Sequence, residues 1–164
     1  MKQVHDSKTL KIFIDLDCLE FCSQRAGNPK SLDISKETPK SIDKLATATP
    51  NSGHDCFLKG IVVYFDWTIN KIIREQLLRY NFINVISSCS LMHCFEKYQK
   101  AGLIDNNIKS VEEIPLGFAY PISFQTNYLQ LKTIYNQRKQ HKKIEWRDFC
   151  IALKSLPNSH WIGD

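Results

Sequence analysis

A segment in the middle of the chain, residues 54–66, is apolar on both of its alternating faces, and few folds accommodate such a segment. In an extended strand, successive side chains point to opposite faces. One face would carry Phe57, Ile61, Val63 and Phe65, and the other Leu58, Val62 and Tyr64. A strand that is apolar on both faces is typical of the middle of a sheet, so we predict a central strand here.

The spacing of apolar residues predicts one further strand and several helices around this segment. The strand covers residues 8–16, where Leu10, Ile12 and Ile14 share a face. Helices are expected over residues 41–48, 68–81, 90–101, 126–142 and 145–156, with Ser41 and Thr68 as caps and Gly102 and Pro157 as stops. Residues 104–124 are expected to be mostly loop. The pattern predicts a mixed fold with few strands and several helices.

The length of 164 residues suits a single domain over residues 1–164. Residues 1–7 carry no clear pattern, and we expect a loose N-terminus. Residues 27–40 are rich in Gly, Pro, Ser and Lys, so we expect a mobile loop there.

The composition indicates a globular protein, with 43% hydrophobic and 24% charged residues. A net charge of +5 favours anionic partners, which include phosphorylated small molecules and nucleic acid. No secretory signal is visible, and no apolar run approaches the roughly 18 residues of a membrane span. We therefore expect a cytoplasmic protein with no membrane partner.

Six cysteines are present, but none of them form a CxxC pair. A structural zinc site usually shows closer pairs of ligands, so we expect no metal site. Nothing marks the chain as secreted, and buried, reduced cysteines are the better interpretation.

Three polar constellations could carry chemistry, and the first is Gly53-His54-Asp55. A Gly-His pair at the entrance of a strand can place an imidazole over a ligand. The alternative is a turn whose histidine is merely exposed to water, and the residues alone favour that alternative.

The second constellation runs from Gln76 to Asn81 and continues from Ser87 to His93. We expect a helix to end near Asn81, a hydroxyl-rich turn to follow, and a new helix to begin near Ser90. Free backbone N–H groups, serine hydroxyls and the guanidinium of Arg79 would together bind phosphate. Ordinary helix capping by Ser90, with Arg79 in a surface ion pair, explains the same residues equally well.

The third constellation pairs Asn127 with Arg138, which lie eleven positions apart on one predicted helix. That spacing places the two side chains on one face, about 16 Å apart along the axis. Such a face could line an elongated ligand, or it could be a polar stripe facing water. Thr126 or Asn127 could also cap the helix.

In order and spacing, these segments resemble the flavin-dependent thymidylate synthase family over roughly residues 41–156. That family has a Gly-His pair entering a strand, a helix ending in Gln-x2-Arg-His-Arg, a serine turn closed by Ser-x-Arg, a helix with Asn-x-Arg-x3-Asn-x4-Arg, and then Trp-Glu. This chain has Gly53-His54, Gln76-Leu77-Leu78-Arg79-Tyr80-Asn81, Ser87-Ser88-Cys89-Ser90, Asn127 to Arg138, and Glu145-Trp146.

The departures from the family pattern are losses of cationic and amide groups. Arg-His-Arg becomes Arg79-Tyr80-Asn81, and the arginine of Ser-x-Arg is missing. On the later helix, Leu129 and Thr133 replace an arginine and an asparagine. Hydrogen bonds to charged groups contribute about 1.5–3 kcal/mol each, so these losses weaken a phosphate or flavin site. Neighbouring lysines could compensate, and the candidates are Lys59, Lys71 and Lys132.

The resemblance implies an α+β fold in which a small, mostly antiparallel sheet packs against several helices. It implies a homotetramer that holds FAD between subunits and methylates dUMP to dTMP, with methylenetetrahydrofolate and NADPH as co-substrates. Carried over residue by residue, it implies cofactor-binding roles for His54, Tyr80, Asn81 and Asn127, and substrate-binding roles for Gln76, Arg79, Ser88, Ser90 and Arg138. Arg138 would also be catalytic, because it would contact and polarise the pyrimidine.

Two other functions stay open. A catalytically inactive homologue could keep the fold and bind a nucleotide or a protein. A small basic nucleic-acid-binding protein is suggested by the run from Arg138 to Lys143 and by the Tyr and Trp content. No recognisable nucleic-acid-binding motif accompanies that run, so nucleic acid is the least favoured partner.

Overall fold

A five-stranded antiparallel sheet forms the centre of the protein, in the strand order β1-β2-β3-β5-β4. The computed structural model describes residues 1–26, 37–50 and 52–163. The strands are β1 (Lys2–Asp6), β2 (Leu10–Ile14), β3 (Val62–Asn70), β4 (Asn84–Ser88) and β5 (Ala119–Asn127). The α-helices are α1 (Leu16–Arg25), α2 (Ile42–Ala46), α3 (Lys71–Leu77), α4 (Leu91–Lys100), α5 (Tyr128–Arg138) and α6 (Ile144–Ala152). Short 3-10 turns cover Cys56–Lys59, Val111–Glu113, Leu153–Ser155 and Ser159–Trp161.

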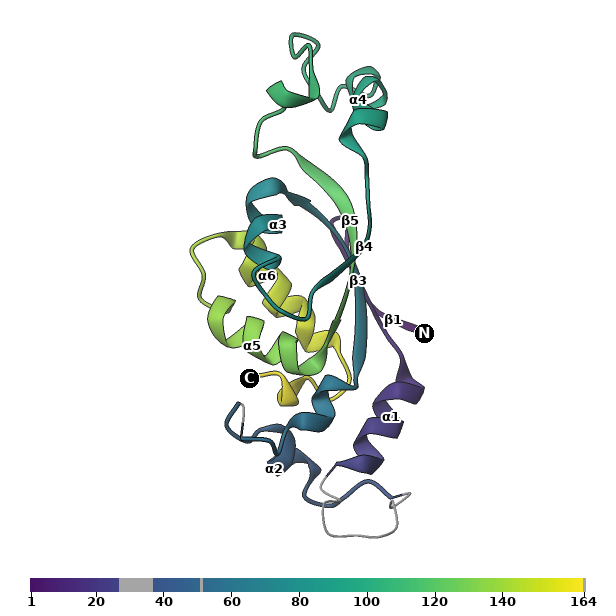
Figure 1. Cartoon of the computed structure of the whole chain (residues 1–164), viewed down its shortest axis with the longest axis vertical. Coiled ribbons are helices and arrows are strands. Elements are labelled where there is room, and N and C mark those ends of the chain that lie inside the picture. Colours follow the sequence, from purple (N-terminus) through teal and green to yellow (C-terminus); the bar gives the residue numbers. More distant parts are fainter. Residues whose placement is uncertain (27–36, 51, 164) are drawn as a thin grey trace.

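Helices α3, α5 and α6 lie together along one face of the sheet, as Figure 1 shows. The core between these helices and the sheet is strongly aromatic. On β3, Phe65 stacks on Phe124 with ring centroids 5.0 Å apart, and Trp67 stacks on Phe149 at 4.6 Å. Trp146 of α6 meets the edge of Trp67 at 5.5 Å. Burial of these large rings is the dominant stabilising contribution in this part of the protein.

The predicted fold class is confirmed, since the protein is one α+β domain with an antiparallel sheet. The predicted central strand is also present, but it covers Val62–Asn70 instead of 54–66. Residues 56–59 form a 3-10 turn, and the alternation of buried side chains continues through Trp67 to Ile69. The following helix therefore begins after Asn70, whose side chain caps it, and not at Thr68.

Three strands, β1, β4 and β5, lie where the sequence predicts none. The hydroxyl-rich segment after α3 is the edge strand β4, all of whose residues are exposed. The second half of the predicted 104–124 loop is β5, which pairs with both β3 and β4. Residues 1–7 are not loose, because β1 pairs with β2. Most of the expected 27–40 loop lies outside the described residues.

The helical predictions agree better with the structure. Helix α4 ends before Gly102, which has a positive φ of 68°, as the sequence predicts. Helix α2 follows Ser41, although the Ser41 side chain makes no capping hydrogen bond. Helix α5 is capped by Asn127. Helix α1 is an addition, and the carboxylate of Asp15 caps it by accepting two backbone N–H bonds.

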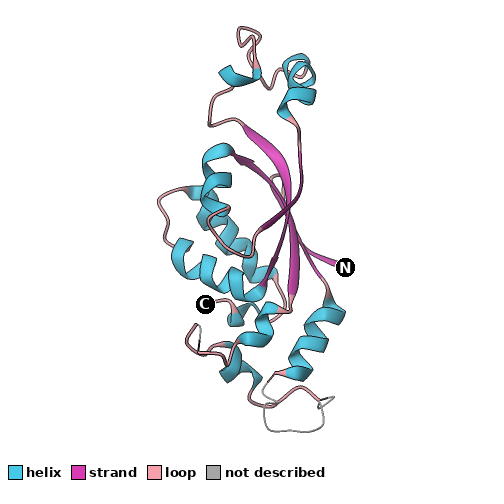
Figure 2. Ribbon diagram, viewed as in Figure 1, coloured by secondary structure: helices cyan, strands magenta, loops and turns pink. Residues whose placement is uncertain are grey.

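One end of the molecule projects beyond the sheet. Figure 2 shows α4 and the loop that follows it reaching past the ends of the strands. Helix α4 has no buried residue, and large apolar side chains such as Met92, Leu103 and Leu116 are exposed on this lobe. The lobe, residues 89–118, thus has very little core of its own.

Candidate functional site

The turn that ends α3, residues 79–82, carries several of the predicted site residues. It is fixed to the start of α5 at Phe82. The backbone N–H of Phe82 donates to Oε1 of Gln130 over 3.2 Å, and its carbonyl accepts from Oγ1 of Thr126 over 2.8 Å. These two bonds hold the turn against the junction between β5 and α5.

A hollow of about 310 Å³ lies beside this turn. Arg79, Tyr80 and Asn81 line it together. Its remaining walls are formed by Pro50, Lys59, Phe82, Leu129, Gln130 and Thr133. The guanidinium of Arg79 is exposed and makes no hydrogen bond or ion pair within the described part of the chain, so it can bind an anionic ligand.

The three lysines proposed to compensate for missing arginines lie in different places. Lys59 lines the hollow and adds a second cation to Arg79 there. Lys71 lines a separate apolar hollow near Leu116. Lys132 is buried and pairs with Asp55, so it cannot reach a ligand. Lys59 is therefore the lysine placed to compensate.

Arg138 is held at the centre of a polar and aromatic cluster. Its Nε donates to the hydroxyl oxygen of Tyr80 over 2.9 Å, and that hydroxyl donates to Oε1 of Gln137 over 3.0 Å. Its guanidinium carbon lies 4.9 Å from the centre of the Trp146 ring, which is close enough for a cation–π interaction. The two terminal nitrogens of Arg138 make no hydrogen bond to any described residue, so they remain available to a ligand.

Gln76 belongs to the same cluster through Trp146. The indole N–H of Trp146 donates to Oε1 of Gln76 over 2.7 Å. Trp146 is fully buried, so this bond satisfies a polar group that would otherwise be costly to bury. Gln76 and Arg138, which lie far apart in the sequence, are thus brought together by Trp146, and Arg138 in turn bonds to Tyr80.

Asn127 and His54 lie apart from this cluster. The Asn127 side chain caps α5, because its Oδ1 accepts from the backbone N–H of Gln130 over 2.9 Å. His54 lies in the exposed turn before the 3-10 turn at Cys56 and does not line the hollow. Asn127 therefore has a structural role of its own, and only its amide nitrogen remains for a ligand.

Ser88 and Ser90 lie at the far end of β4, away from Arg79. The intervening strand has five residues and spans about 17 Å. Ser90 is the N-cap residue of α4, but its hydroxyl makes no capping bond. The predicted site residues thus form two groups, one around Arg79 and Arg138 and one at the base of the projecting lobe.

The basic run after Arg138 is partly occupied by aromatic contacts. The ammonium of Lys139 lies 5.3 Å from the centre of the Tyr135 ring. Partial burial, followed by the positive charges of Arg138 and Lys142, lowers the pKa of His141 below its ordinary value. His141 therefore adds no charge to this run at neutral pH.

Sequence reasoning missed Phe82, Gln130 and Pro50 as walls of the hollow. Nothing in their local pattern marks them, because Phe82 and Gln130 meet through the pairing of β4 with β5, and Pro50 reaches the hollow from the separate segment after α2. No group of three or more His, Cys, Asp or Glu side chains within residues 1–26, 37–50 and 52–163 is placed to hold a metal.

All six cysteines are free thiols, and Cys150 is the one that is buried, so burial of the cysteines as a group was a wrong prediction. No described helix is long and apolar enough to cross a membrane.

Comparison with known proteins finds similarity in structure alone. No protein-family model and no curated protein sequence matches this chain. The flavin-dependent thymidylate synthase ThyX from Helicobacter pylori, solved with FAD and dUMP, aligns with a TM-score of 0.65 and 17% identity, covering 88% of this chain and 92% of that one. A second structure of the Helicobacter pylori enzyme with FAD and dUMP gives a TM-score of 0.64 and 14% identity, covering 93% and 95%. The chain thus has the flavin-dependent thymidylate synthase fold, and the resemblance is confirmed at that level.

Proposed function

We propose that this chain binds dUMP together with FAD and catalyses the reductive methylation of dUMP to dTMP. The observation that carries the proposal is the hollow beside α3, where Arg79 and Lys59 supply two cations next to Tyr80 and Asn81. Solved structures of the same fold contain FAD and dUMP, which supports this choice of ligands.

The residues of the hollow suit a nucleotide phosphate. Arg79 would bind phosphate oxygens through paired N–H donors, and Lys59 would add a point charge. The volume of about 310 Å³ is at the lower end of small-molecule sites, which suits a mononucleotide or one half of a dinucleotide. FAD is a longer molecule, so a second surface would have to complete its site.

Arg138 would act on the pyrimidine of dUMP. Its Nε is held by Tyr80, and its plane rests on Trp146, so the two terminal nitrogens are fixed in direction. A preorganised cation of this kind stabilises negative charge that develops on a substrate. FAD, when bound and reduced, would supply the redox chemistry, with NADPH and methylenetetrahydrofolate as co-substrates.

The site would be shared between copies of the chain. Within one copy of the chain, strand β4 separates Ser88 and Ser90 from Arg79. One ligand can contact both groups more easily if Arg79 comes from one copy and the serines come from another. The projecting lobe exposes Met92, Leu103 and Leu116, and apolar surface of this kind marks interaction sites. By resemblance, we propose a homotetramer.

A catalytically inactive, nucleotide-binding homologue is the second candidate. Leu129 and Thr133 line the hollow at the two positions where the family has an arginine and an asparagine. Their side chains cannot bind phosphate as an arginine does. This favours a chain that keeps the fold but no longer binds the cofactor.

The test is reconstitution with FAD, followed by assay of dTMP formation with all co-substrates. A visible flavin absorption band that stays with the protein through gel filtration, together with dTMP, supports the first candidate. Thermal stabilisation by dUMP without dTMP supports the second. A colourless protein that dUMP does not stabilise would contradict both.

Arg79→Gln provides the site-specific variant, and Arg74→Gln, on the preceding helix α3, is its matched control. Arg74 pairs with Glu75 outside the hollow. Loss of a charge-assisted bond should weaken dUMP binding by about ten- to a hundredfold in Arg79→Gln. Arg74→Gln should bind dUMP as the unmodified protein does.

A further inference from the structure

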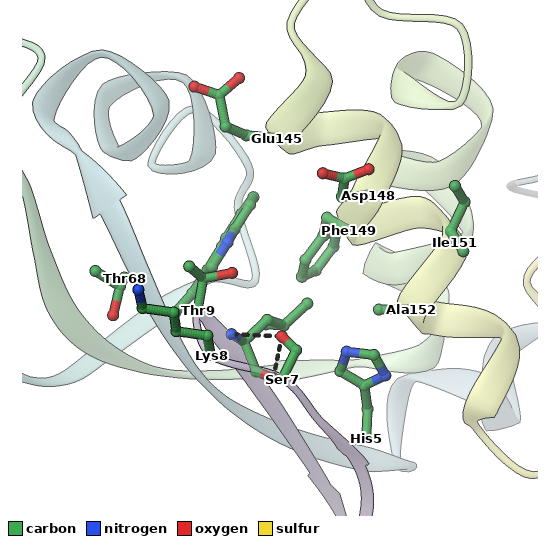
Figure 3. Close-up of a pocket in the computed structure, with 12 residues that line it drawn as sticks. His5, Ser7, Lys8, Thr9, Thr68, Glu145, Asp148, Phe149, Ile151 and Ala152 are labelled. Atoms are coloured by element: carbon green, nitrogen blue, oxygen red, sulfur yellow. Dashed lines mark hydrogen bonds between the residues drawn. The ribbon is translucent and has the colours of Figure 1, made fainter.

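A second cavity, of about 530 Å³, lies between α6 and the hairpin formed by β1 and β2. It shares no lining residue with the hollow beside α3. Figure 3 shows side chains of α6 on one side of it and those of the hairpin, with Thr68 of β3, on the other. The volume falls within the range of small-molecule sites.

The floor of the cavity is apolar and aromatic. Trp67 and Phe149 stack on each other there, and both are buried, as is Leu10. Ile151 is exposed at the edge of the cavity. The accessible apolar surface of the cavity therefore comes mainly from Ile151, which the ring of an aromatic ligand can cover.

The indole N–H of Trp67 is a hydrogen-bond donor without an acceptor. Trp67 is 4% exposed, and its N–H makes no hydrogen bond within the described part of the chain, whereas Trp146 and Trp161 both donate from theirs. No fully buried side-chain nitrogen or oxygen among the described residues lacks a partner. The Trp67 N–H must therefore touch accessible space, and the cavity that Trp67 lines provides that space.

The walls carry an excess of negative charge. Glu145 and Asp148 lie three positions apart on α6, on the face that also bears Phe149. Neither carboxylate makes a hydrogen bond or ion pair within the described residues. Lys8 supplies one positive charge on the opposite wall, so the carboxylates outnumber it.

We propose that this cavity binds a small aromatic amine that carries a hydrogen-bond acceptor. The ring covers Ile151 at the edge of the cavity, the ammonium group lies between the carboxylates of Glu145 and Asp148, and the acceptor receives the Trp67 N–H. This site is independent of nucleotide binding, because it uses different residues.

Four related molecules test the proposal by titration against the ¹⁵N-labelled protein, followed by NMR at neutral pH. Tyramine has the ring, the ammonium and a phenolic oxygen as acceptor. Tyrosol lacks the charge, 4-hydroxyphenylacetate reverses it, and phenethylamine lacks the acceptor. Tyramine should shift the Trp67 indole N–H signal saturably, tyrosol and 4-hydroxyphenylacetate should bind at least about tenfold more weakly, and phenethylamine should bind a few-fold more weakly.

The variant Glu145→Gln/Asp148→Asn separates the charge from the cavity shape. Both side chains reach the surface, so the variant should fold, which the dispersion of its spectrum checks. It should lose about tenfold in affinity for tyramine and none for tyrosol. Glu96→Gln, which removes an exposed carboxylate on α4, should leave tyramine binding unchanged. The proposal is overturned if tyramine gives no saturable shift, if tyrosol binds equally well, or if the double variant retains full affinity for tyramine.

Discussion

The ammonium nitrogen of Lys132 lies 3.0 Å from Oδ2 of Asp55, and both side chains are almost completely buried. The same nitrogen donates to the carbonyl oxygens of Ala46 over 2.7 Å and Ala48 over 2.8 Å. Helix α5 thus fastens the segment from α2 to the 3-10 turn at Cys56, which carries one wall of the candidate nucleotide site. Three acceptors satisfy the three N–H groups of the ammonium.

Removing Asp55 should therefore destabilise the protein strongly. Asp55→Ala leaves a buried ammonium without a counter-charge, at a cost of about 3–5 kcal/mol in the free energy of unfolding. The double variant Asp55→Ala/Lys132→Met removes both charges and should be more stable than the single variant. Urea denaturation monitored by tryptophan fluorescence measures both.

The exposed pair of Arg74 and Glu75 is the control for this measurement. Its side chains are 31% and 55% exposed, and Arg74→Ala should cost less than about 1 kcal/mol. A double variant at positions 55 and 132 that is less stable than Asp55→Ala would show that the ion pair is not the source of the effect.

Gln76 should prove important for stability, whatever it does for a ligand. Gln76→Met keeps the length of the side chain but removes the acceptor for the buried Trp146 N–H, which should cost about 1–3 kcal/mol. Gln76→Glu retains an oxygen acceptor and should be less harmful. Equal stability of Gln76→Met and the unmodified protein would mean that water replaces the lost acceptor.

The C-terminal segment should loosen in acid through Asp43. Its Oδ1 accepts from the indole N–H of Trp161 over 2.7 Å and lies 2.8 Å from Nε2 of His160. The bond from Trp161, followed by that from His160, lowers the pKa of Asp43 below its ordinary value of 3.8. A carboxyl whose pKa is lower in the folded state stabilises that state above its ordinary pKa, and this contribution is lost as pH falls through the lowered value.

Tryptophan fluorescence followed from neutral pH to pH 2 measures this loss. The unmodified protein should show a transition below pH 3.8 that Asp43→Asn lacks, because the amide oxygen still accepts from Trp161 but does not titrate. An identical acid transition in both proteins would assign it to other carboxyl groups.

Apart from α1, the helices follow from local pattern, as do β2 and the central strand, but β1, β4 and β5 do not. Strand β5 contains Pro121, and proline is uncommon within strands because it donates no backbone hydrogen bond. Here β4 ends beside it, and the Pro121 carbonyl accepts from the backbone N–H of Cys89, the first residue beyond β4. Strand β4 buries none of its side chains, so it shows no alternation that could be recognised.

The candidate site is predictable only in part for a related reason. Arg79, Tyr80 and Asn81 are adjacent in sequence, and any fold would keep them together. The surroundings of Arg138 depend on the end of α3 meeting α5 and α6, since Tyr80 approaches it from the turn after α3 and Trp146 approaches it from α6. Such a cluster arises from packing, and no spacing within one segment encodes it.

The separation of Arg79 from Ser88 and Ser90 leads to a prediction about assembly. If one ligand contacts both groups, they must come from different copies of the chain. Arg79→Ala and the double variant Ser88→Ala/Ser90→Ala should then each bind dUMP poorly when pure. Ser88 and Ser90 make no side-chain hydrogen bond within the described residues, so the serine substitutions should not disturb the fold.

Mixing the two variants and allowing the subunits to exchange should restore binding. In a mixed oligomer, about a quarter of the shared sites take an intact Arg79 from one copy and intact serines from another. Isothermal titration with dUMP should detect that fraction at the affinity of the unmodified protein. A mixture that binds no better than its separate components, although mass measurement shows exchanged subunits, would mean that the two groups serve different sites or that each site is completed within one copy.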